Sequence, residues 1–393
     1  MKTFSKLTGR LLGQPMFHLL EKIERFKKAG RDIIHLEIGD ADFRAHQHII
    51  DATKNALDAD KTHYVNSMGL NELRDAICEY TLQTLDFRPR REQVLVMPAH
   101  AIIDTLIRCV ANPGDEIICP EPGFSSYHAV LTYLNLKKTS IPLKEENKFC
   151  LQAADIEPKI HDHTRLLIIT SPNNPTGSVL SKKQVRDIAL LCQQKDIYLL
   201  SDEIYSRVIY EGQHYSCSFL DQCRERTIIL NGFGKSFSMP GWRLGYAIGP
   251  VDLIQKMGLL FQTIYSCCSP FNQYGAIEAL TGNQEVVEAR IKTYKSLRDF
   301  ILSEINDIPG ITCTAPKGAF YIFPNIKETG LTSAAFADYM LKKADVALLP
   351  GTHFGQTGEG YVRICFTKKQ DELHRACERI RNALKERVQC DQF

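Results

Sequence analysis

Residues 231–245 read Asn-Gly-Phe-Gly-Lys-Ser-Phe-Ser-Met-Pro-Gly-Trp-Arg-Leu-Gly and contain a single lysine, Lys235. A lysine becomes a nucleophile near neutral pH only when desolvation or a neighbouring positive charge lowers its pKa. Lys235 follows the apolar run Thr227–Leu230 and has Arg243 eight residues farther on. The setting suits a lysine that forms a Schiff base, although a Gly-Lys pair alone is more often part of a surface loop.

Two further polar motifs follow apolar runs of strand length. Residues 171–177 (Ser-Pro-Asn-Asn-Pro-Thr-Gly) come after Arg165–Thr170, and residues 201–205 (Ser-Asp-Glu-Ile-Tyr) come after Ile197–Leu200. Such runs are typical of strands buried on both faces of a parallel sheet, and ligands bind at the carboxyl ends of those strands. A carboxylate there, Asp202, is expensive to bury unless it is paired. The alternative role for Asp202 is to cap the N-terminus of a helix.

The three motifs together, in this order and spacing, resemble the class I and II aminotransferases of the fold type I pyridoxal-phosphate enzymes. The resemblance runs from about Leu36 to Arg363. It implies an α/β fold whose large domain, residues 45–276, holds a mostly parallel seven-stranded sheet between helices. Residues 1–44 and 277–393 would form a smaller α+β domain. Two such chains would form a homodimer with active sites at the interface.

The resemblance assigns the central chemistry to three side chains. Lys235 matches the lysine that holds pyridoxal 5′-phosphate as a Schiff base and then moves a proton. Asp202 matches the aspartate that pairs with the protonated pyridine nitrogen, which keeps the ring an electron sink. Tyr205 matches one hydrogen-bond partner of the cofactor's 3′ oxygen. Asn174 matches the other partner and also a substrate contact, although an Asn-Pro turn needs no ligand to exist.

Other residues match the family's contacts to the rest of the cofactor and to the substrate. Phe124 matches the aromatic that stacks on the pyridine ring, Arg243 the clamp on the phosphate, and Tyr64 a tyrosine that reaches the partner's phosphate across the dimer interface. Arg363 matches the arginine that grips the substrate's α-carboxylate, and Gly39 begins a turn at the substrate site. Without the resemblance, Phe124 is a packing residue, Tyr64 a half-buried loop aromatic and Arg363 a salt-bridge residue.

The expected phosphate cradle departs from the family's pattern. Val94–Met97 reads as a strand and Ala99–Val110 as a helix, whose first amides and dipole attract an anion. Relatives have small residues and glycine at this turn, whereas this chain has Pro98-Ala99-His100, and proline contributes no N–H. We expect Ala99 and His100 to contact the phosphate. Helix capping or burial in the core is the alternative for His100.

Two hydroxyl groups are also missing beside Lys235. Relatives commonly carry serine or threonine where Gly232 and Gly234 stand, and the first of these often donates a hydrogen bond to the phosphate. Each missing neutral hydrogen bond weakens phosphate binding by about 0.5–1.5 kcal/mol. We therefore expect Gly232→Ser to tighten cofactor binding.

The ends of the chain read as parts of the smaller domain. Phe17–Ala29 has the apolar period of an amphipathic helix, which Gly30 ends. Gln284–Ile305 reads as a charged helix, and Gly318–Phe323 and Tyr361–Phe366 read as strands.

Composition argues against several classes of function. The chain has 393 residues, which favours a large domain with a smaller companion. A net charge of +2 argues against a nucleic-acid or anionic-membrane surface. The 13 cysteines form no C-x-x-C pair, so we expect reduced thiols and no metal site. Residues 1–10 lack an apolar core and no run of about eighteen apolar residues occurs, so we expect a cytoplasmic protein without membrane spans.

We expect a pyridoxal-phosphate-dependent aminotransferase that moves an amino group between an amino acid and a 2-oxo acid. Two alternatives stay open at this point. The fold alone does not choose the reaction, so a lyase, decarboxylase or oxidase remains possible. The altered turn at Pro98 favours, more weakly, a cofactor-binding protein without turnover, against which the joint retention of Lys235, Asp202 and Arg363 argues. The sequence does not reveal which amino acid is the substrate, because the residues that select its side chain lie in loops.

Overall fold

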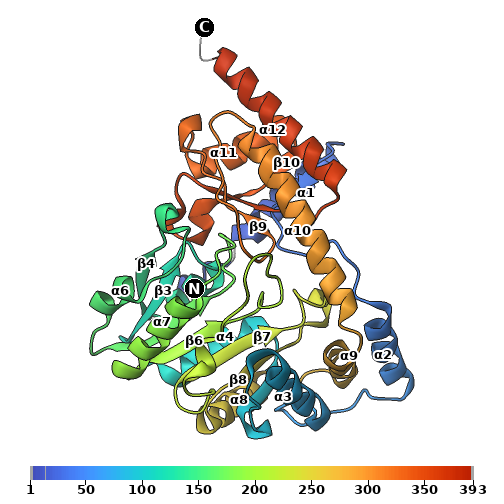
Figure 1. Cartoon of the computed structure of the whole chain (residues 1–393), viewed down its shortest axis with the longest axis vertical. Coiled ribbons are helices and arrows are strands. Elements are labelled where there is room, and N and C mark those ends of the chain that lie inside the picture. Colours follow the sequence, from blue (N-terminus) through green and yellow to red (C-terminus); the bar gives the residue numbers. More distant parts are fainter. Residues whose placement is uncertain (1–2, 14, 391–393) are drawn as a thin grey trace.

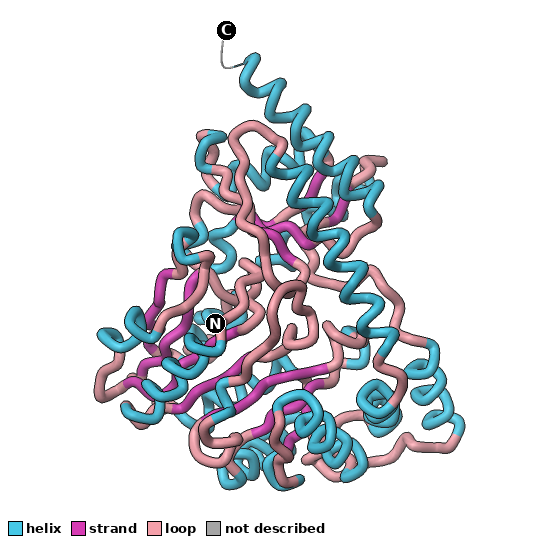
Figure 2. The backbone as a smooth tube through the Cα atoms, in the orientation of Figure 1, coloured by secondary structure: helices cyan, strands magenta, loops and turns pink. Residues whose placement is uncertain are grey.

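The computed structural model of the chain describes residues 3–13 and 15–390. Its largest feature is a seven-stranded sheet with the strand order β2-β8-β7-β6-β5-β3-β4, which occupies the lower part of Figures 1 and 2. Strand β8 is antiparallel to both its neighbours and the other pairs are parallel, so the sheet is mostly parallel, as predicted. The strands are β2 (Val94–Met97), β3 (Glu116–Glu121), β4 (Lys137–Pro142), β5 (Thr164–Thr170), β6 (Tyr198–Asp202), β7 (Thr227–Gly232) and β8 (Gly245–Ile248).

Helices cover both faces of this sheet. Along β5, Leu166 and Ile168 belong to one hydrophobic cluster and Leu167 and Ile169 to another, because successive side chains of a strand point to opposite faces. The continuous apolar run of β5 is thus buried on both sides, as predicted. The first cluster includes α3 (Asn71–Leu85), α4 (Ala99–Val110), α5 (Ser125–Leu134), α8 (Val251–Tyr265) and α9 (Pro270–Thr281), and the second includes α6 (Ala153–Ile156) and α7 (Lys182–Gln194).

The three polar motifs begin at one edge of the sheet. Thr170 of β5 is paired with Asp202 of β6, and Asp202 is paired with Leu230 of β7. These strands are parallel neighbours, so the segments that follow them leave the sheet side by side. The strand pattern read from the sequence therefore placed the motifs correctly.

A second group of elements lies above the sheet in Figure 1. It contains a three-stranded antiparallel sheet in the order β11-β12-β9, and a parallel pair of β1 with β10 that joins the N-terminal segment to the C-terminal part. The domain boundaries at residues 44/45 and 276/277 stay a prediction. The elements of this group are α1 (Pro15–Lys28), β1 (Ile34–His35), α10 (Glu285–Asn306), β9 (Tyr321–Ile322), α11 (Ser333–Tyr339), β10 (Val346–Ala347), β11 (Leu349–Pro350), β12 (Val362–Cys365) and α12 (Gln370–Cys390). Helix α2 (Gln47–Asp58) lies instead low in Figure 1, where it packs on α9.

One predicted strand is much shorter than expected. Of Gly318–Phe323, only Tyr321–Ile322 forms a strand, because Ala319 has a φ of 56° and bends the chain just before it. The predicted strand at Tyr361–Phe366 is confirmed as β12, and the helices expected at Phe17–Ala29 and Gln284–Ile305 are confirmed as α1 and α10.

The twelve cysteines whose side chains are described are free, and no cluster of His, Cys, Asp and Glu side chains in the described part of the chain could hold a metal ion. No helix in that part of the chain combines the length and apolar character needed to cross a membrane.

Candidate active site

A cavity of about 300 Å³ opens beside the carboxyl ends of β5, β6 and β7. Its wall contains every site residue predicted from the sequence except Tyr64. Gly39 and Arg363 reach it from the second group of elements, so the cavity lies between that group and the sheet. The predicted residues in its wall are Gly39, Ala99, His100, Phe124, Asn174, Asp202, Tyr205, Lys235, Arg243 and Arg363.

Lys235 lies in the loop after β7 with its side chain turned into this cavity. Its Nζ donates a hydrogen bond to the carbonyl oxygen of Gly39 at 2.5 Å. The same atom lies 5.5 Å from the ring centre of Phe320 and 5.9 Å from that of Tyr205. Burial lowers the pKa of Lys235 below its ordinary value, while the charge of Asp40 acts in the opposite direction. The desolvation that a nucleophilic lysine needs is therefore present.

Asp202 ends β6 with 5% of its surface exposed. One carboxylate oxygen, Oδ2, accepts a hydrogen bond from Tyr127 Oη at 2.5 Å, and Oδ1 accepts one from the Ile204 amide at 3.2 Å. Burial raises the pKa of Asp202 to about 6, although these two hydrogen bonds act to lower it. The chain continues as a turn, so the N-cap role is wrong. A cation brought into the cavity would stabilise this carboxylate.

Tyr127 is a site residue that the sequence reasoning missed. It is buried in α5, and besides its bond to Asp202 its Oη hydrogen-bonds Thr170 Oγ1 at 2.8 Å. Phe124, one turn earlier, packs edge-on against the rings of Tyr127 and His100 at 5.6 and 5.8 Å between centres. Nothing in the sequence marks Tyr127 as a partner of Asp202, because the contact joins residues 75 positions apart.

Arg363 comes from β12 and is 4% exposed. Its Nη1 donates to Asn174 Oδ1 at 3.1 Å and its Nη2 donates to the Glu37 carbonyl. The guanidinium lies over the rings of Tyr321 and Phe354, 4.4 and 4.9 Å from their centres. Its buried Nε has no hydrogen-bond partner among the residues described. The salt-bridge interpretation is wrong for this arginine, whose hydrogen bonds go to neutral oxygens, and it can receive an anion from the cavity.

Tyr205 meets a second tyrosine that the sequence reasoning did not assign. Tyr205 is 3% exposed, and its Oη hydrogen-bonds the Oη of Tyr321 at 2.7 Å. Gly39 lies against the same hydroxyl, because a Cβ at this position would come within 2.1 Å of Tyr321 Oη. A side chain at residue 39 would therefore displace Tyr321, and only glycine allows the close approach.

The other end of the cavity carries positive potential. Ala99 and His100 are the first two residues of α4, and Pro98 stands at its N-cap without a side-chain capping bond. Arg243 lines the same cavity and is exposed, with Nη1 donating to the Pro240 carbonyl at 3.0 Å. Burial and the charge of Arg243 lower the pKa of His100. A helix N-terminus beside a guanidinium is chemistry that holds a phosphate.

The expectation for Gly232 needs correction. Gly232 ends β7, pairs with Gly245 and is not part of the cavity wall. A Cβ there would lie 3.1 Å from Gly245 Cα and 3.2 Å from the Leu244 carbonyl, in a tight place. Gly234 lines the cavity, and a Cβ there would lie 3.5 Å from Pro240 Cα, which is an ordinary contact. The hydroxyl that the cavity lacks is therefore the one at residue 234.

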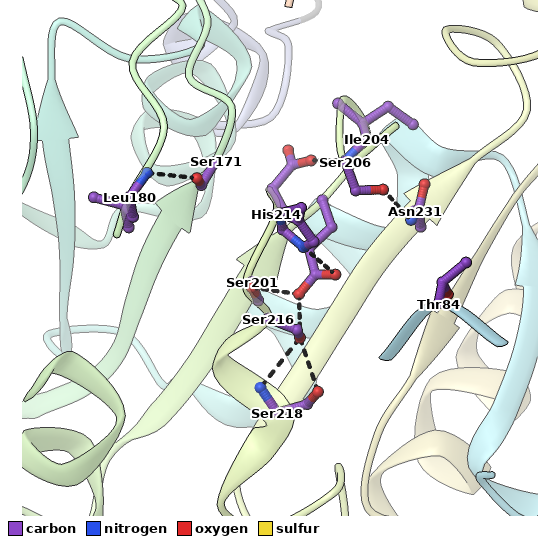
Figure 3. Close-up of polar contacts among 12 residues, drawn as sticks. Thr84, Ser171, Leu180, Ser201, Ile204, Ser206, His214, Ser216, Ser218 and Asn231 are labelled. Atoms are coloured by element: carbon purple, nitrogen blue, oxygen red, sulfur yellow. Dashed lines mark hydrogen bonds and ion pairs between the residues drawn. The ribbon is translucent and has the colours of Figure 1, made fainter. Parts of the chain in front are cut away.

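Glu203, next to Asp202, is not part of the cavity wall and anchors the turn after β6. Figure 3 shows its hydrogen-bond partners Ser201, His214 and Ser216 gathered at this turn. Its Oε1 accepts hydrogen bonds from Ser201 Oγ at 2.8 Å and from Ser216 Oγ, and its Oε2 lies 2.9 Å from His214 Nε2. Glu203 is 1% exposed. This network fixes the backbone that carries Asp202, a role that the sequence reasoning did not assign.

Tyr64 is the predicted site residue that the structure does not bring to the cavity. It is 89% exposed, so the interpretation as a half-buried loop aromatic is wrong. Within one chain it contributes nothing to the site.

The cavity fits pyridoxal phosphate in four respects: a buried carboxylate, a lysine with lowered pKa, an aromatic ring in the wall, and a helix N-terminus with an arginine. A sequence model of the family "aminotransferase class I and II" matches residues 31–380. The chain belongs to this family. Because the family depends on pyridoxal phosphate, this aminotransferase is a pyridoxal-phosphate-dependent enzyme of fold type I.

Relatives of this aminotransferase match it over nearly their whole length. An aspartate aminotransferase of Pyrococcus abyssi is 40% identical, with 91% of this chain and 93% of the relative covered. Aromatic-amino-acid aminotransferase 2 of Thermococcus litoralis is 38% identical, with 90% and 92% covered. The crystal structure of an aromatic aminotransferase from Pyrococcus horikoshii is 38% identical with a TM-score of 0.88, covering 93% of this chain and 99% of its own.

Asp202→Asn should change how the cofactor-free aminotransferase responds to pH. The folded pKa of Asp202, about 6, lies above the unfolded value of 3.8. Stability from the protonated carboxyl is therefore present at low pH and lost as pH rises through about 6. Between about pH 4.5 and 7.5 the parent should lose about 2 kcal/mol of unfolding free energy relative to the variant. Urea titrations measure this, and a pH-independent difference would contradict it.

Gly234→Ser should tighten binding of pyridoxal phosphate. One added neutral hydrogen bond contributes about 0.5–1.5 kcal/mol, which is at most about tenfold in dissociation constant. Gly232→Ser is the matched control and should not tighten binding, because its Cβ points into packed backbone. The measurement is a cofactor titration of the cofactor-free proteins at one pH and salt concentration. If Gly232→Ser tightened cofactor binding and Gly234→Ser did not, the missing hydroxyl would belong at residue 232.

Proposed function

We propose that this aminotransferase moves an amino group between an amino acid and a 2-oxo acid with Lys235, Asp202 and Tyr205 as its catalytic residues. Bound pyridoxal phosphate supplies an electrophilic carbon and a ring that takes up electrons. One observation carries the assignment: a lysine whose pKa is lowered by burial and a buried carboxylate face the same cavity.

Lys235 has two tasks in this proposal. It would hold the bound cofactor covalently. As a free amine it would move a proton between the substrate's Cα and the cofactor's C4′. An ammonium group could not accept that proton, so the desolvation that lowers the pKa of Lys235 is what lets one side chain serve as tether and base.

Asp202, Tyr205 and Asn174 hold the ring of the cofactor. The Asp202 carboxylate pairs with the protonated ring nitrogen and keeps it charged, while Tyr127 fixes the orientation of the carboxylate. Tyr205 and Asn174 hydrogen-bond the 3′ oxygen. Phe124 supplies the flat apolar face on which the ring rests.

The two ends of the cavity bind the two anions. Ala99, His100 and Arg243 hold the phosphate at the N-terminus of α4. At the other end, Arg363 binds the substrate's α-carboxylate, beside Gly39, with a guanidinium whose Nε has no partner among the described residues.

A homodimer is part of the proposal. Tyr64 is 89% exposed, and Leu259 and Ile264 on α8 are 58% and 62% exposed. The segment of Tyr64 lies beside α8, since a Cβ at Gly258 would be 2.2 Å from the Met68 sulfur. Exposed apolar side chains gathered in one region mark protein interfaces. A second copy on this face would put each Tyr64 at the partner's phosphate.

The cellular location and the domain boundaries are proposals of the same kind. We place the aminotransferase in the cytoplasm, because its free cysteines suit a reducing compartment. We take residues 45–276 as the large domain and residues 1–44 with 277–393 as the small one.

Borohydride should attach the cofactor permanently to Lys235. Peptide mapping of the reduced protein should place the label on this residue, and Lys235→Ala should carry none. A label on another lysine would end the proposed role of Lys235.

Mixed dimers should show whether Tyr64 serves the partner's site. In a dimer of one Lys235→Ala chain and one Tyr64→Phe chain, the site that keeps Lys235 receives an intact Tyr64 only from its partner. That site should bind cofactor like the parent, whereas the Tyr64→Phe homodimer should bind at least about tenfold more weakly, because a hydrogen bond to a charged group contributes about 1.5–3 kcal/mol. Equal weakening in both, or a fully active monomer by light scattering, would contradict the proposal.

A further inference from the structure

Tyr321 lines the active-site cavity, and the function proposed above gives it no task. It lies in β9, in the second group of elements, with 1% of its surface exposed. Among the residues that the structure describes, its hydroxyl has one hydrogen-bond partner, the Oη of Tyr205 at 2.7 Å. Tyr205 stands in the turn after β6. This bond therefore joins the second group of elements to the sheet at the cavity.

The surroundings of Tyr321 fix the position of its hydroxyl. The ring packs edge-on against the ring of Tyr205, with 5.8 Å between the centres. The guanidinium of Arg363 lies over the Tyr321 ring, 4.4 Å from its centre. Gly39 leaves the space that the oxygen occupies, because a Cβ there would come within 2.1 Å of it. The hydroxyl is thus a packed part of the site that faces Tyr205.

The cofactor would fix the direction of the hydrogen bond between the two tyrosines. A phenol has one hydrogen to donate, and its oxygen can also accept. In the proposed function Tyr205 bonds the 3′ oxygen of pyridoxal phosphate, which can only accept when it is ionised. The hydrogen of Tyr205 is then used on the cofactor, so Tyr321 must donate to Tyr205. The bonds run in one order, from Tyr321 to Tyr205 to the 3′ oxygen.

The charge of Arg363 favours the same direction. Burial raises the pKa of Tyr321, and Arg363 is the strongest influence that acts to lower it. Burial also raises the pKa of Tyr205, and the neighbouring Tyr321 adds to that rise. Tyr321 is therefore the hydroxyl that gains more from the cation and the better donor of the two. Hydrogen bonds in a chain polarise one another, so a Tyr205 that accepts a bond donates a stronger one.

We propose that Tyr321 is a positioning residue, which orients and strengthens the hydrogen bond that Tyr205 donates to the 3′ oxygen of the cofactor. It acts through the hydroxyl of Tyr205. The proposal rests on the function proposed above, because Tyr205 must bond the 3′ oxygen for Tyr321 to act on it.

This role has a consequence for the proton on Lys235. In pyridoxal phosphate the 3′ oxygen stands next to the ring carbon that carries C4′, the atom to which Lys235 is attached in the proposed function. A stronger hydrogen bond to the oxygen withdraws negative charge from it. The nitrogen of Lys235 then holds its proton less tightly. Tyr321 therefore lowers the pH at which this proton is lost.

Titration of the cofactor-free proteins with pyridoxal phosphate tests the proposal. Tyr321→Phe removes only the hydroxyl and should bind the cofactor about three- to tenfold more weakly, because a chain of hydrogen bonds strengthens each bond by about 10–30%. The cofactor analogue that lacks the 3′ hydroxyl should bind equally to the parent and to Tyr321→Phe. Tyr205→Phe and the double variant should bind pyridoxal phosphate equally, since Tyr321 then has no hydroxyl to act through.

Tyr210→Phe is the matched control. Tyr210 is also buried, lies 5.2 Å from the guanidinium of Arg298 measured to the ring centre, and donates a hydrogen bond to the Ala319 carbonyl just before β9. It is not part of the cavity wall. This variant should bind pyridoxal phosphate like the parent. Equal losses in Tyr210→Phe and Tyr321→Phe would mean that support of β9, and not the bond to Tyr205, affects binding.

The visible absorbance of the bound cofactor gives an independent readout, because it follows the protonation of the Lys235 nitrogen. In a pH titration of the loaded proteins, the midpoint should move upward in Tyr321→Phe, by up to about one pH unit for a tenfold effect. It should move farther upward in Tyr205→Phe, which loses the whole bond to the 3′ oxygen. A midpoint that stays at the parent value in Tyr321→Phe would contradict the proposal.

Three binding results would also overturn it. Parent-like affinity of Tyr321→Phe for pyridoxal phosphate would mean that the bond between the tyrosines is not used. Equal weakening for the cofactor and for the analogue would mean that Tyr321 only packs. A double variant weaker than Tyr205→Phe would mean that Tyr321 acts by another route. Failure of the proposed function looks different: Tyr205→Phe itself would then bind pyridoxal phosphate like the parent, which would end both proposals.

Discussion

The active site depends on the burial of one carboxylate at the carboxyl edge of a parallel sheet. Asp202 accepts hydrogen bonds from Tyr127 and from the Ile204 amide, yet its pKa is raised to about 6, so these bonds do not fully offset the loss of water. The neighbouring Glu203 acts in the same direction as burial. A ligand with a positive ring nitrogen relieves this imbalance directly, which makes the cavity selective for such a ligand before any other contact is considered.

Burial also shifts the pKa of Lys235, in the direction opposite to the shift of Asp202. It lowers the pKa of the amine while it raises the pKa of the Asp202 carboxyl, so both groups are moved toward their uncharged forms. For the lysine this is useful chemistry, because a base must be unprotonated to take a proton from carbon. For the aspartate it is a cost of about 3 kcal/mol, which corresponds to the difference between its ordinary pKa of 3.8 and about 6. Perturbed groups of both kinds in one cavity are typical of active sites.

How much of the site could be predicted depended on where each residue stands in the chain. Lys235, Asp202 and Asn174 were placed in the cavity wall correctly because each follows a strand whose apolar run is legible in the sequence. Tyr127 and Tyr321 were missed, because each meets the site through a contact set by tertiary packing. Residues 318–323 show the same limit, since one positive φ shortened the predicted strand. The hydroxyl missing at residue 232 was expected to serve the phosphate because relatives carry one there, but in this chain Gly232 is the last residue of β7 and lies outside the cavity wall.

The seven-stranded sheet and the second group of elements each supply part of the active site. The sheet supplies Asp202 and the loop of Lys235, and the second group of elements supplies Arg363 and Tyr321. That group is tied together at the cavity, because Arg363 bonds the Glu37 carbonyl and Thr367 bonds the Asp40 carbonyl at 2.6 Å. These two bonds hold the segment of Gly39 against β12, which carries Arg363. The hydrogen bond between Tyr321 and Tyr205 joins this group to the turn after β6, so the two parts that supply the site also meet there.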